Sequence, residues 1–347
     1  MITRLSAPQH EELWRVEDAE SGLRGYIALQ STVLGPAAGG LRMRPYDSDE
    51  DAIADVLNLS RGMSYKNAAA DLPLGGGKAV IMGHPATKTP AMLRAMGRAI
   101  AALDGRYWTA EDMGMSPADM AEIARETRHV AGLDSGPFAS GDPSPVTAQG
   151  VFNALKIGLK HRYDRDDVQG TTVAVQGLGH VGWHLCRLLH EAGARLILAD
   201  TDATRLTQSC ADFGATAGDV ATIHAAEADV FAPCAIGGTL NATTIPDIRA
   251  GLIAGAANNQ LATPADADRL AARGILYLPD YVANGGGIIN VAAEILRIED
   301  RTPWVAARLE ALSTTMTRIL THAAAKGQSP AHLADTIIGE RLLPRAG

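Results

Sequence analysis

A glycine-rich turn between two apolar stretches constrains the fold of this chain more than any other feature. The apolar segment 172–175 is followed by Gly177, Gly179 and Gly182 in the spacing GxGxxG, then by a predicted helix and a second apolar segment that ends in Asp200. A strand, turn and helix in this order, with a carboxylate about 20 residues further on, are typical of a doubly wound parallel sheet that binds a dinucleotide. The alternative is a strand–helix turn that holds no nucleotide.

The residues of this turn indicate how a dinucleotide would bind. Gly177 allows the tight turn, Gly179 lets a pyrophosphate approach the backbone, and Gly182 lets the helix pack closely on the strand. Asp200 can accept hydrogen bonds from ribose hydroxyls and repels a 2′-phosphate, so NAD is favoured over NADP. The turn residues that we predict to contact NAD are Gly177, Leu178, Gly179, His180, Val181 and Gly182.

The remainder of the C-terminal half continues the alternation of strands and helices. Strand-like segments at 228–231, 252–256 and 275–278 predict a parallel sheet with crossover helices. Because such a sheet binds ligands at the carboxyl ends of its strands, the segments after these strands are predicted to line the cofactor site. They include Cys234, Ala235, Ile236, Asn258, Asn259 and residues 284–287.

The N-terminal half has a different organisation. Segments 25–33, 78–82 and 107–110 are strand-like, whereas 90–103 and 117–127 are helical. A run rich in Gly, Ser, Pro and Asp follows Val130, and 347 residues exceed one ordinary core. We therefore predict an α/β protein with an N-terminal domain over 1–140, a nucleotide-binding domain over 141–325, and a C-terminal helix over 326–347 that packs back on the first domain.

Charge and hydropathy exclude several classes of protein. The net charge of -8 argues against a nucleic-acid-binding surface. The chain has no apolar run of about 18 residues and opens with no basic segment before an apolar one, so we expect a cytoplasmic protein with no membrane partner. Cys186, Cys210 and Cys234 are far apart and are expected to be free thiols rather than metal ligands.

Six Ser-Pro or Thr-Pro pairs predict helix starts, because the hydroxyl can cap the first turn and proline needs no amide partner there. The hydroxyl residues of these pairs are Thr89, Ser116, Ser144, Thr263, Thr302 and Ser329.

Two lysines and an aspartate are the candidate chemical groups of the N-terminal half. Lys66 lies near the end of a helix predicted to begin at Ser48, and Lys78 follows a glycine triplet at 75–77 that lets a backbone or a ligand approach closely. Asp112 follows the strand-like segment 107–110. The alternative is that all three side chains are solvated, since spacing alone does not show that they converge.

Eight blocks, spread in order over nearly the whole chain, carry a family resemblance. They are GPAAGGLRM at 35–43, GMSYKNAAADLPLGGGKAVIMG at 62–83, TAEDMGM at 109–115, GDPSPVTAQGV at 141–151, VAVQGLGHVG at 173–182, FAPCAIGG at 231–238, AGAANNQL at 254–261 and NGGGIINVAAE at 284–294. These blocks resemble the amino acid dehydrogenases of the glutamate, leucine, phenylalanine and valine group.

The resemblance implies the reversible, NAD-dependent oxidative deamination of an L-amino acid to a 2-oxo acid and ammonia. It also implies that the N-terminal domain binds the substrate and forms a homo-oligomer, and that a cleft separates it from a C-terminal Rossmann domain that binds NAD. By position, Lys66 would bind the substrate carboxylate, Lys78 would be the general base that activates water, and Asp112 would exchange protons with the amino group. The resemblance further places Gly39, Gly40, Thr147 and Asn259 around substrate and nicotinamide, with Asn258 as a companion.

The substrate class follows from one difference within the family. Glutamate dehydrogenases carry a lysine for the side-chain carboxylate where this chain has Ala38. The other residues that the resemblance assigns to the side-chain pocket, Met63, Ala110, Ile288 and Val291, are apolar as well, so an apolar substrate is expected. The segment 109–112 is similar to leucine dehydrogenases and favours a branched-chain substrate, and the alternative is an aromatic one, as in phenylalanine dehydrogenases.

Two other classes of function compete with this interpretation. A catalytically silent NAD-binding regulator would have no need of Lys66, Lys78 and Asp112 together. A hydroxy-acid dehydrogenase would need a His/Arg pair, and no histidine here stands at a comparable strand end.

Overall fold

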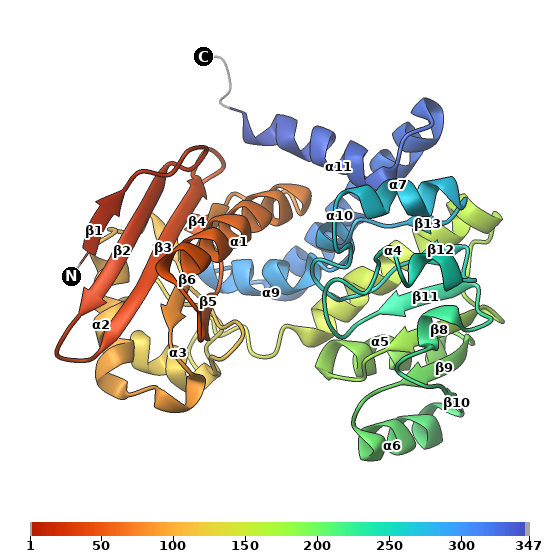
Figure 1. The fold of residues 1–347 in the computed structure, drawn as a ribbon, viewed down its shortest axis with the longest axis horizontal. Coiled ribbons are helices and arrows are strands. Elements are labelled where there is room, and N and C mark those ends of the chain that lie inside the picture. The colour runs from red at the N-terminus through yellow and green to blue at the C-terminus, as the bar shows by residue number, and fades with distance from the viewer. Residues whose placement is uncertain (1, 344–347) are drawn as a thin grey trace. The chain divides into compact units, whose positions relative to one another are not determined.

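The computed structural model describes residues 2–343, which form two compact units (Figure 1). Unit 1 contains the described residues up to Asp142, Ile288–Ala306 and the described residues from Ile338. Unit 2 contains Pro143–Gly287 and Ala307–Ile337. Each unit has its own sheet.

Unit 1 is organised around a mixed sheet with the strand order β1-β2-β3-β6-β4-β7, in which β5 also pairs with β6. Neighbours from β1 to β6 are antiparallel, whereas β4, β5 and β7 run parallel to their partners. The strands are β1 Ile2–Leu5, β2 Glu12–Asp18, β3 Leu23–Ser31, β4 Ala37–Ala38, β5 Leu41–Arg44, β6 Gly75–Met82 and β7 Tyr107–Trp108.

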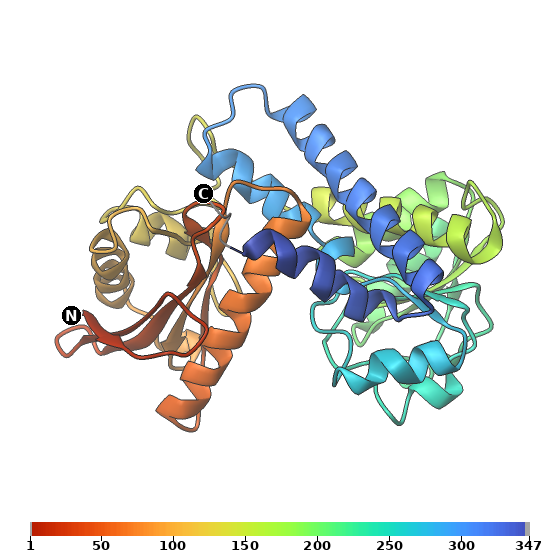
Figure 2. The ribbon, with the colours of Figure 1, turned by 90° about the horizontal axis from the view of Figure 1, so that it is seen from above.

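Alternate residues of β3 supply two cores, one on each face of this sheet. Ile27 and Leu29 belong to the core that includes residues of α2, whereas Tyr26 and Ala28 pack with Val56 of α1. The helix α1 lies along its face of the sheet (Figure 2). The helical elements of this unit include α1 Asp49–Ala69, α2 Pro90–Ala101, α3 Pro117–Ile123 and the 3₁₀ turns η1 Pro85–Thr87 and η4 Glu340–Leu342.

Unit 2 contains an all-parallel sheet in the order β10-β9-β8-β11-β12-β13. The strand order reverses between β8 and β11, which is the point where a doubly wound sheet binds its ligand. The predicted α/β class and doubly wound C-terminal sheet are therefore confirmed. The strands are β8 Thr172–Gln176, β9 Arg195–Ala199, β10 Thr216–Ala217, β11 Val230–Pro233, β12 Leu252–Ile253 and β13 Leu276–Tyr277.

The helices of the C-terminal half cover this sheet or contain residues of both units. Those within unit 2 are α4 Ser144–Tyr163, α5 His180–Glu191, α6 Ala203–Phe213, α7 Ala265–Ala272, α8 Asp280–Ala283 and the 3₁₀ turns η2 Ile223–Ala225 and η3 Ile245–Asp247. Residues of both units occur in α9 Gly286–Ile295, α10 Arg301–Lys326 and α11 Pro330–Gly339.

All six Ser-Pro and Thr-Pro pairs lie at helix starts, as predicted, but only three of the hydroxyls cap the helix. The hydroxyls of Thr89 and Ser116 accept hydrogen bonds from the amides of the first turns of α2 and α3, and that of Ser329 accepts from the amide of Ala331 at the start of α11. The other three do not cap: α4 begins at Ser144 itself, the Thr263 hydroxyl donates to the Asp266 carboxylate, and α10 begins before Thr302. Across residues 2–343, no helix has the length and apolar character that a membrane span requires.

Candidate functional site

Glycines at the start of β6 let α1 lie close to the sheet. A Cβ on Gly76 would lie 2.0 Å from the Oγ of Ser64, and the Nδ2 of Asn67 donates a 2.6 Å hydrogen bond to the carbonyl of Gly75. The triplet is therefore part of the strand rather than a flexible loop, so β6 begins three residues before the predicted start at Lys78. Strand propensity did not predict residues 75–77 as part of the strand, because glycine is depleted in strands. Here glycine is needed because the neighbouring helix packs closely against the strand.

Lys78, on β6, forms an ion pair with Asp112, which lies after β7. The Nζ of Lys78 lies 2.8 Å from the Oδ2 of Asp112, and the two side chains are 7% and 26% exposed. The same Oδ2 accepts a 3.0 Å hydrogen bond from the Nε of Arg42 on β5. Burial raises the pKa of Asp112, but the charges of Lys78 and Arg42 outweigh it and hold that pKa at about 2. Asp112 is therefore an ionised carboxylate between two cations.

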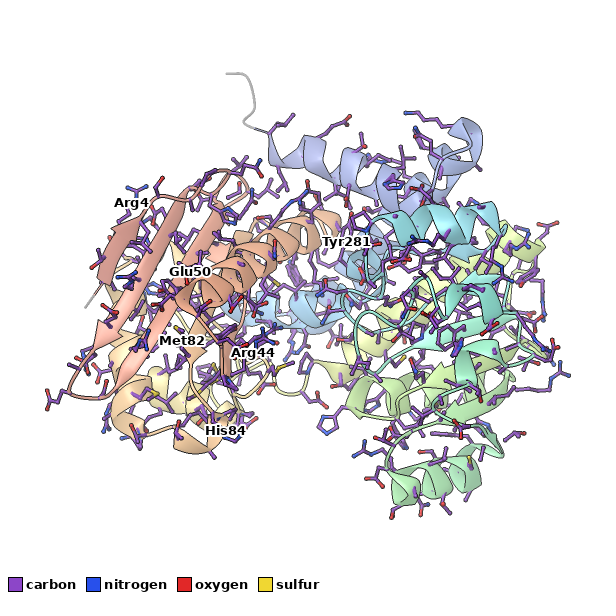
Figure 3. The ribbon with its side chains drawn as sticks, viewed as in Figure 1. Arg4, Arg44, Glu50, Met82, His84 and Tyr281 are labelled. Carbon is purple, nitrogen blue, oxygen red and sulfur yellow. The ribbon has the colours of Figure 1, made fainter. Side chains whose placement is uncertain are left out.

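A second carboxylate holds Arg42 in place. The Nη1 of Arg42 lies 3.3 Å from the Oδ2 of Asp55 on α1, which also accepts a 2.7 Å hydrogen bond from the hydroxyl of Tyr46. The Nε of Arg44, labelled in Figure 3, lies 3.8 Å from the same oxygen. This chain of charges connects α1 and β5 to Asp112.

Gly39 and Gly40 bring the backbone after β4 against Met63 and Asp112. A Cβ on Gly39 would lie 2.8 Å from the Cγ of Met63, and one on Gly40 would lie 2.9 Å from the Cβ of Asp112. The buried hydroxyl of Tyr107 donates a 2.8 Å hydrogen bond to the carbonyl of Gly39. Burial raises the pKa of Tyr107 above its ordinary value, so the hydroxyl stays protonated and able to donate.

Lys66 lies in the last turn of α1, where the helix dipole favours a cation. It is half-buried and follows Met63 by three residues, so the two side chains share one side of the helix. Of the predicted substrate residues, Met63, Gly39, Gly40, Lys78 and Asp112 are thus brought together by direct contacts, with Lys66 on the same helix side as Met63.

The remaining predicted pocket residues of unit 1 occupy three places: β4, the segment after β7, and α9. Ala37 belongs to the core on the α2 face, so the side chain of Ala38 points to the α1 face, where it is fully buried. Ala110 is 9% exposed, and its carbonyl accepts a 2.8 Å hydrogen bond from the amide of Leu41. Ile288 and Val291 lie on α9.

In unit 2 the glycine turn has the geometry that a pyrophosphate requires. A Cβ on Gly177 would lie 2.7 Å from the Cβ of Ala235, and one on Gly182 would lie 2.0 Å from the carbonyl oxygen of Gly177. A Cβ on Gly179, by contrast, would meet no described atom within 4 Å. Gly179 is the N-cap of α5 and makes no side-chain cap, so the first amides of the helix are accessible to an anion. The turn therefore fits a dinucleotide.

Asp200 closes this turn at the end of β9. Its Oδ2 accepts a 2.6 Å hydrogen bond from the amide of Leu178, and its Oδ1 accepts one of 2.8 Å from the amide of Asp202. The Nη1 of Arg205, on α6, lies 3.7 Å from the same Oδ2. The carboxylate is thus held rigidly beside the turn, with a cation next to it.

The other predicted cofactor residues of unit 2 lie on the loops after β11 and β12. The amide of Cys234 donates to the carbonyl of Gln176 at 2.7 Å, and Ile236 is 72% exposed. The Oδ1 of Asn258 accepts a 2.9 Å hydrogen bond from Asn284. Asn259 has a φ of 53°, and its carbonyl accepts from the amide of Gly238 at 2.8 Å, which joins the two loops.

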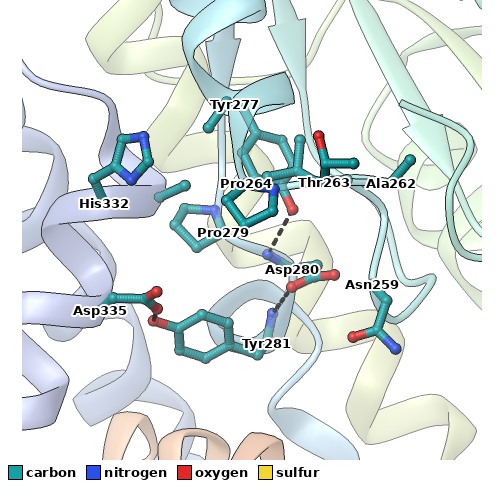
Figure 4. A pocket seen from close by; sticks show the side chains of 13 residues that line it. Asn259, Ala262, Thr263, Pro264, Tyr277, Pro279, Asp280, Tyr281, His332 and Asp335 are labelled. Atoms are coloured by element: carbon teal, nitrogen blue, oxygen red, sulfur yellow. Dashed lines mark hydrogen bonds between the residues drawn. The ribbon is translucent and has the colours of Figure 1, made fainter. Parts of the chain in front are cut away.

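Asn259 also lines a pocket of about 240 Å³ in unit 2 (Figure 4). Its wall includes Asp280, whose carboxylate accepts from the amides of Gln260 and Tyr281 at 2.9 and 2.6 Å, and Asp335, which accepts from the Tyr281 hydroxyl at 3.0 Å. Thr147 is elsewhere, on α4, with its hydroxyl donating to the carbonyl of Pro143 at 2.9 Å. A Cβ on Gly287 would lie 2.8 Å from that hydroxyl oxygen.

Sequence reasoning missed four residues that support these groups: Arg42, Tyr107, Arg205 and Glu294. Arg42 lies within the block 35–43, next to a buried strand position. A charged residue at such a place is a signal that sequence analysis could have used. Tyr107 and Arg205 carry no such signal, because their roles depend on which backbone groups the fold brings within reach. Glu294 ends the block 284–294, and its role likewise depends on backbone groups that are distant in sequence.

The geometry of unit 1 supports proton transfer at a bound amino group. The Nζ of Lys78 lies 2.8 Å from the Oδ2 of the ionised Asp112. Beside this pair, Gly39 and Gly40 leave the backbone without side chains that would keep a ligand away. Residues 2–343 contain no cluster of three or more His, Cys, Asp or Glu side chains arranged to hold a metal ion.

Two family models match this chain. Residues 10–129 match the model described as "Glu/Leu/Phe/Val dehydrogenase, dimerisation domain", and residues 139–206 and 203–339 match "Glutamate/Leucine/Phenylalanine/Valine dehydrogenase". These matches cover both units.

Individual relatives agree with the family models. The leucine dehydrogenase of Geobacillus stearothermophilus is 50% identical over 287 residues, which are 82% of this chain and 78% of that protein. The valine dehydrogenase of Streptomyces virginiae is 44% identical over 96% of this chain and 94% of that protein. The crystal structure of L-tryptophan dehydrogenase from Nostoc punctiforme superposes with a TM-score of 0.85 at 39% identity, covering 96% of both chains.

Proposed function

The chain belongs to the Glu/Leu/Phe/Val dehydrogenase family and is an amino acid dehydrogenase, and from this premise we propose that it catalyses the reversible, NAD-dependent oxidative deamination of an L-amino acid with a branched apolar side chain. The products are the 2-oxo acid and ammonia. The observation that carries the proposal is the buried pair of Lys78 and Asp112 beside Gly39 and Gly40.

Substrate binding in unit 1 rests on charge and backbone. The ammonium of Lys66 holds the substrate carboxylate, and Gly39 and Gly40 let the substrate approach the backbone. The ionised carboxylate of Asp112 accepts a proton from the substrate ammonium, because a free amine is needed before the bond between Cα and hydrogen can break. Arg42 keeps Asp112 oriented through the 3.0 Å hydrogen bond.

The second half of the reaction is hydrolysis of the imino acid. Lys78 first releases to solvent the proton that it carries in the ion pair with Asp112. The neutral amine then acts as the general base that takes a proton from water while the water oxygen bonds to the imino carbon. The resulting carbinolamine then loses its C–N bond: Asp112 returns a proton to the nitrogen, the hydroxyl proton passes to the departing ammonia, and ammonium and the 2-oxo acid leave. The 2.8 Å separation of the two groups lets a proton pass between them.

NAD, when bound, supplies the hydride acceptor. Gly177, Gly179 and Gly182 would hold its pyrophosphate at the start of α5, and Asp200 its adenosine ribose. Leu178, His180, Val181, Thr147, Cys234, Ala235, Ile236 and Asn258 complete the proposed cofactor set, and Asn259 holds nicotinamide and substrate in register. NAD is proposed rather than NADP because the Asp200 carboxylate repels a 2′-phosphate, although Arg205 lies beside it.

The apolar substrate class is supported by Ala38, Met63, Ala110, Ile288 and Val291, which offer no partner to a side-chain carboxylate. Similarity to leucine and valine dehydrogenases favours branched side chains. An aromatic substrate is the second candidate, because the structure of L-tryptophan dehydrogenase from Nostoc punctiforme superposes over nearly the full length of this chain.

Initial rates of NADH formation with leucine, valine, isoleucine, phenylalanine, tryptophan and glutamate test the substrate class. We expect the highest kcat/KM with a branched-chain substrate and negligible turnover of glutamate. A preference for phenylalanine or tryptophan would replace branched-chain with aromatic specificity, and a preference for glutamate would refute the argument from Ala38. The match of residues 10–129 to a dimerisation domain supports a homo-oligomeric enzyme.

A further inference from the structure

The helix α9 carries a buried carboxylate that the proposed reaction does not use. Glu294 is 7% exposed. Its Oε2 accepts hydrogen bonds from the amides of Gly132 at 2.8 Å and Ser140 at 3.0 Å, and its Oε1 accepts one of 3.4 Å from the amide of Leu133. A buried carboxylate is costly unless it is hydrogen-bonded, and here three backbone amides of one loop provide the bonds.

Two neighbours of Glu294 hold the same loop through its carbonyls. The Nδ2 of Asn290, four residues earlier on α9, donates to the carbonyl of Ser140 at 3.1 Å. Arg301 donates to the carbonyls of Ala139 and Ser140 at 3.2 and 2.7 Å, and also to the Oδ1 of Asn290. The loop 132–140, which by composition is flexible, is therefore held at both ends. All of these residues belong to unit 1.

The other side of this loop contacts the segment that carries Asp112. Gly132 has a φ of 79°, and a Cβ on it would lie 3.8 Å from the amide nitrogen of Glu111 and 3.9 Å from the Cβ of Ala110. The amide of Ala131 donates to the carbonyl of Thr109 at 2.8 Å. Gly132 therefore lies beside residues 110 and 111, and Ala131 is bonded to Thr109, so the loop adjoins the segment that carries Asp112.

The same helix also carries two of the proposed side-chain pocket residues. Ile288, Val291 and Glu294 follow one another at intervals of three residues, so they lie along one side of α9, which is drawn in light blue in Figure 1. Glu294 binds Gly132, and Gly132 is next to Ala110. One carboxylate therefore connects the helix that carries Ile288 and Val291 to the loop beside Ala110, which is another proposed pocket residue.

We propose that Glu294 is a positioning residue that sets the width of the apolar side-chain pocket between α9 and Ala110 in unit 1, and with it the substrate selectivity. This inference rests on the proposed function, because it concerns the substrate of that reaction. Asn290 and Arg301 serve the same purpose from the carbonyl side of the loop.

The variant Glu294→Gln tests this role while keeping the side-chain volume. Its amide group would place N–H donors against the N–H groups of the loop, which loosens the loop without opening a cavity. The exposed Glu299, which follows α9 in the same unit, offers Glu299→Gln as the matched control. The readouts are kcat and KM for 2-aminobutyrate, valine, leucine and methionine at saturating NAD, and the NAD dissociation constant.

We expect Glu294→Gln to lower the ratio of kcat/KM for leucine to kcat/KM for 2-aminobutyrate by about tenfold. The larger leucine side chain fills the pocket, so it is more sensitive to a displaced pocket wall than the smaller side chain of 2-aminobutyrate. The NAD dissociation constant should stay within about twofold of the wild-type value, since the pyrophosphate turn is in unit 2. Glu299→Gln should behave as wild type. If Glu294→Gln does not fold, Asn290→Ala, which removes the bond to Ser140, should shift selectivity in the same direction.

A purely structural role would lower the activity on all four substrates by the same factor, because it would change only the fraction of folded enzyme. That result, or wild-type selectivity in the folded variants, overturns the inference. A wild-type enzyme that deaminates none of the amino acids would instead overturn the proposed function, so the two failures are distinguishable.

Discussion

At the scale of single residues, Asp112 has the environment that most affects both stability and chemistry. Its Oδ2 lies 2.8 Å from Lys78 and 3.0 Å from Arg42. Because the pKa of Asp112 is about 2 in the folded chain, below the value of about 3.9 expected in the unfolded chain, ionisation of this group favours folding. The stabilisation is complete above about pH 4 and is lost as the pH falls towards 2.

We predict that Asp112→Asn reduces the acid sensitivity of folding. The free energy of unfolding, measured by urea denaturation, should fall by about 2 kcal/mol less between pH 4 and pH 2 in this variant than in the wild type. The exposed Asp134 provides the control Asp134→Asn, which retains Asp112 and should show the full wild-type decline. Parallel pH curves for wild type and Asp112→Asn would contradict the assigned ion pair.

At the scale of elements, the contact between α1 and β6 determines whether unit 1 can form its site. A Cβ on Gly76 would lie 2.0 and 2.2 Å from side-chain and backbone atoms of Ser64, whereas one on Gly62 of the same helix would meet nothing within 4 Å. Gly76 therefore has no room for a side chain, whereas Gly62 does, although both lie in the same sequence block.

We predict that Gly76→Ala lowers the free energy of unfolding by about 2 to 3 kcal/mol, because backbone has to move to relieve the overlap. Gly62→Ala should raise it by about 0.5 to 1 kcal/mol, since alanine is the better helix former at an exposed position. Chemical denaturation of both variants checks the pair, and equal effects would show that α1 does not approach β6 this closely.

The glycine turn of unit 2 allows a similar comparison with a different readout. We predict that Gly182→Ala destabilises the protein, because its Cβ would lie 2.0 Å from the carbonyl oxygen of Gly177. Gly179→Ala should keep the melting temperature within about 2 °C while weakening NAD binding about tenfold or more, since its methyl group occupies the approach to the helix amides. Thermal unfolding and NAD titration separate the two effects, and unchanged NAD affinity in Gly179→Ala would place the pyrophosphate elsewhere.

At the scale of the whole molecule, the architecture was largely predictable from sequence, because the alternation of apolar strands and helices and the GxGxxG turn depend on local pattern. The parallel sheet of unit 2 and its turn were found in this way. Contacts between residues distant in sequence could not be predicted in this way. The hydrogen bonds of Glu294 with Gly132 and of Tyr107 with Gly39 depend on how the folded backbone brings these residues together. Helix capping was predictable only in part. The Thr263 hydroxyl, for example, donates to the carboxylate of Asp266 instead of accepting from a helix amide.

We propose that the two units divide the work of the enzyme. Lys78 and Asp112 of unit 1 would form the acid–base pair, and the glycine turn of unit 2 would hold the dinucleotide. Chemistry and cofactor binding should therefore be separable by a single substitution that leaves the other unit intact.

The most direct measurement compares wild type and Lys78→Ala for NADH, ammonia and 2-oxo acid formed from L-leucine, alongside NAD binding. We predict equal amounts of the three products from the wild type. For Lys78→Ala we predict a loss of about 10²- to 10⁴-fold in kcat, with the NAD dissociation constant unchanged. Wild-type turnover by Lys78→Ala, or NADH formed by the wild type without ammonia, would contradict the proposed roles of the two units.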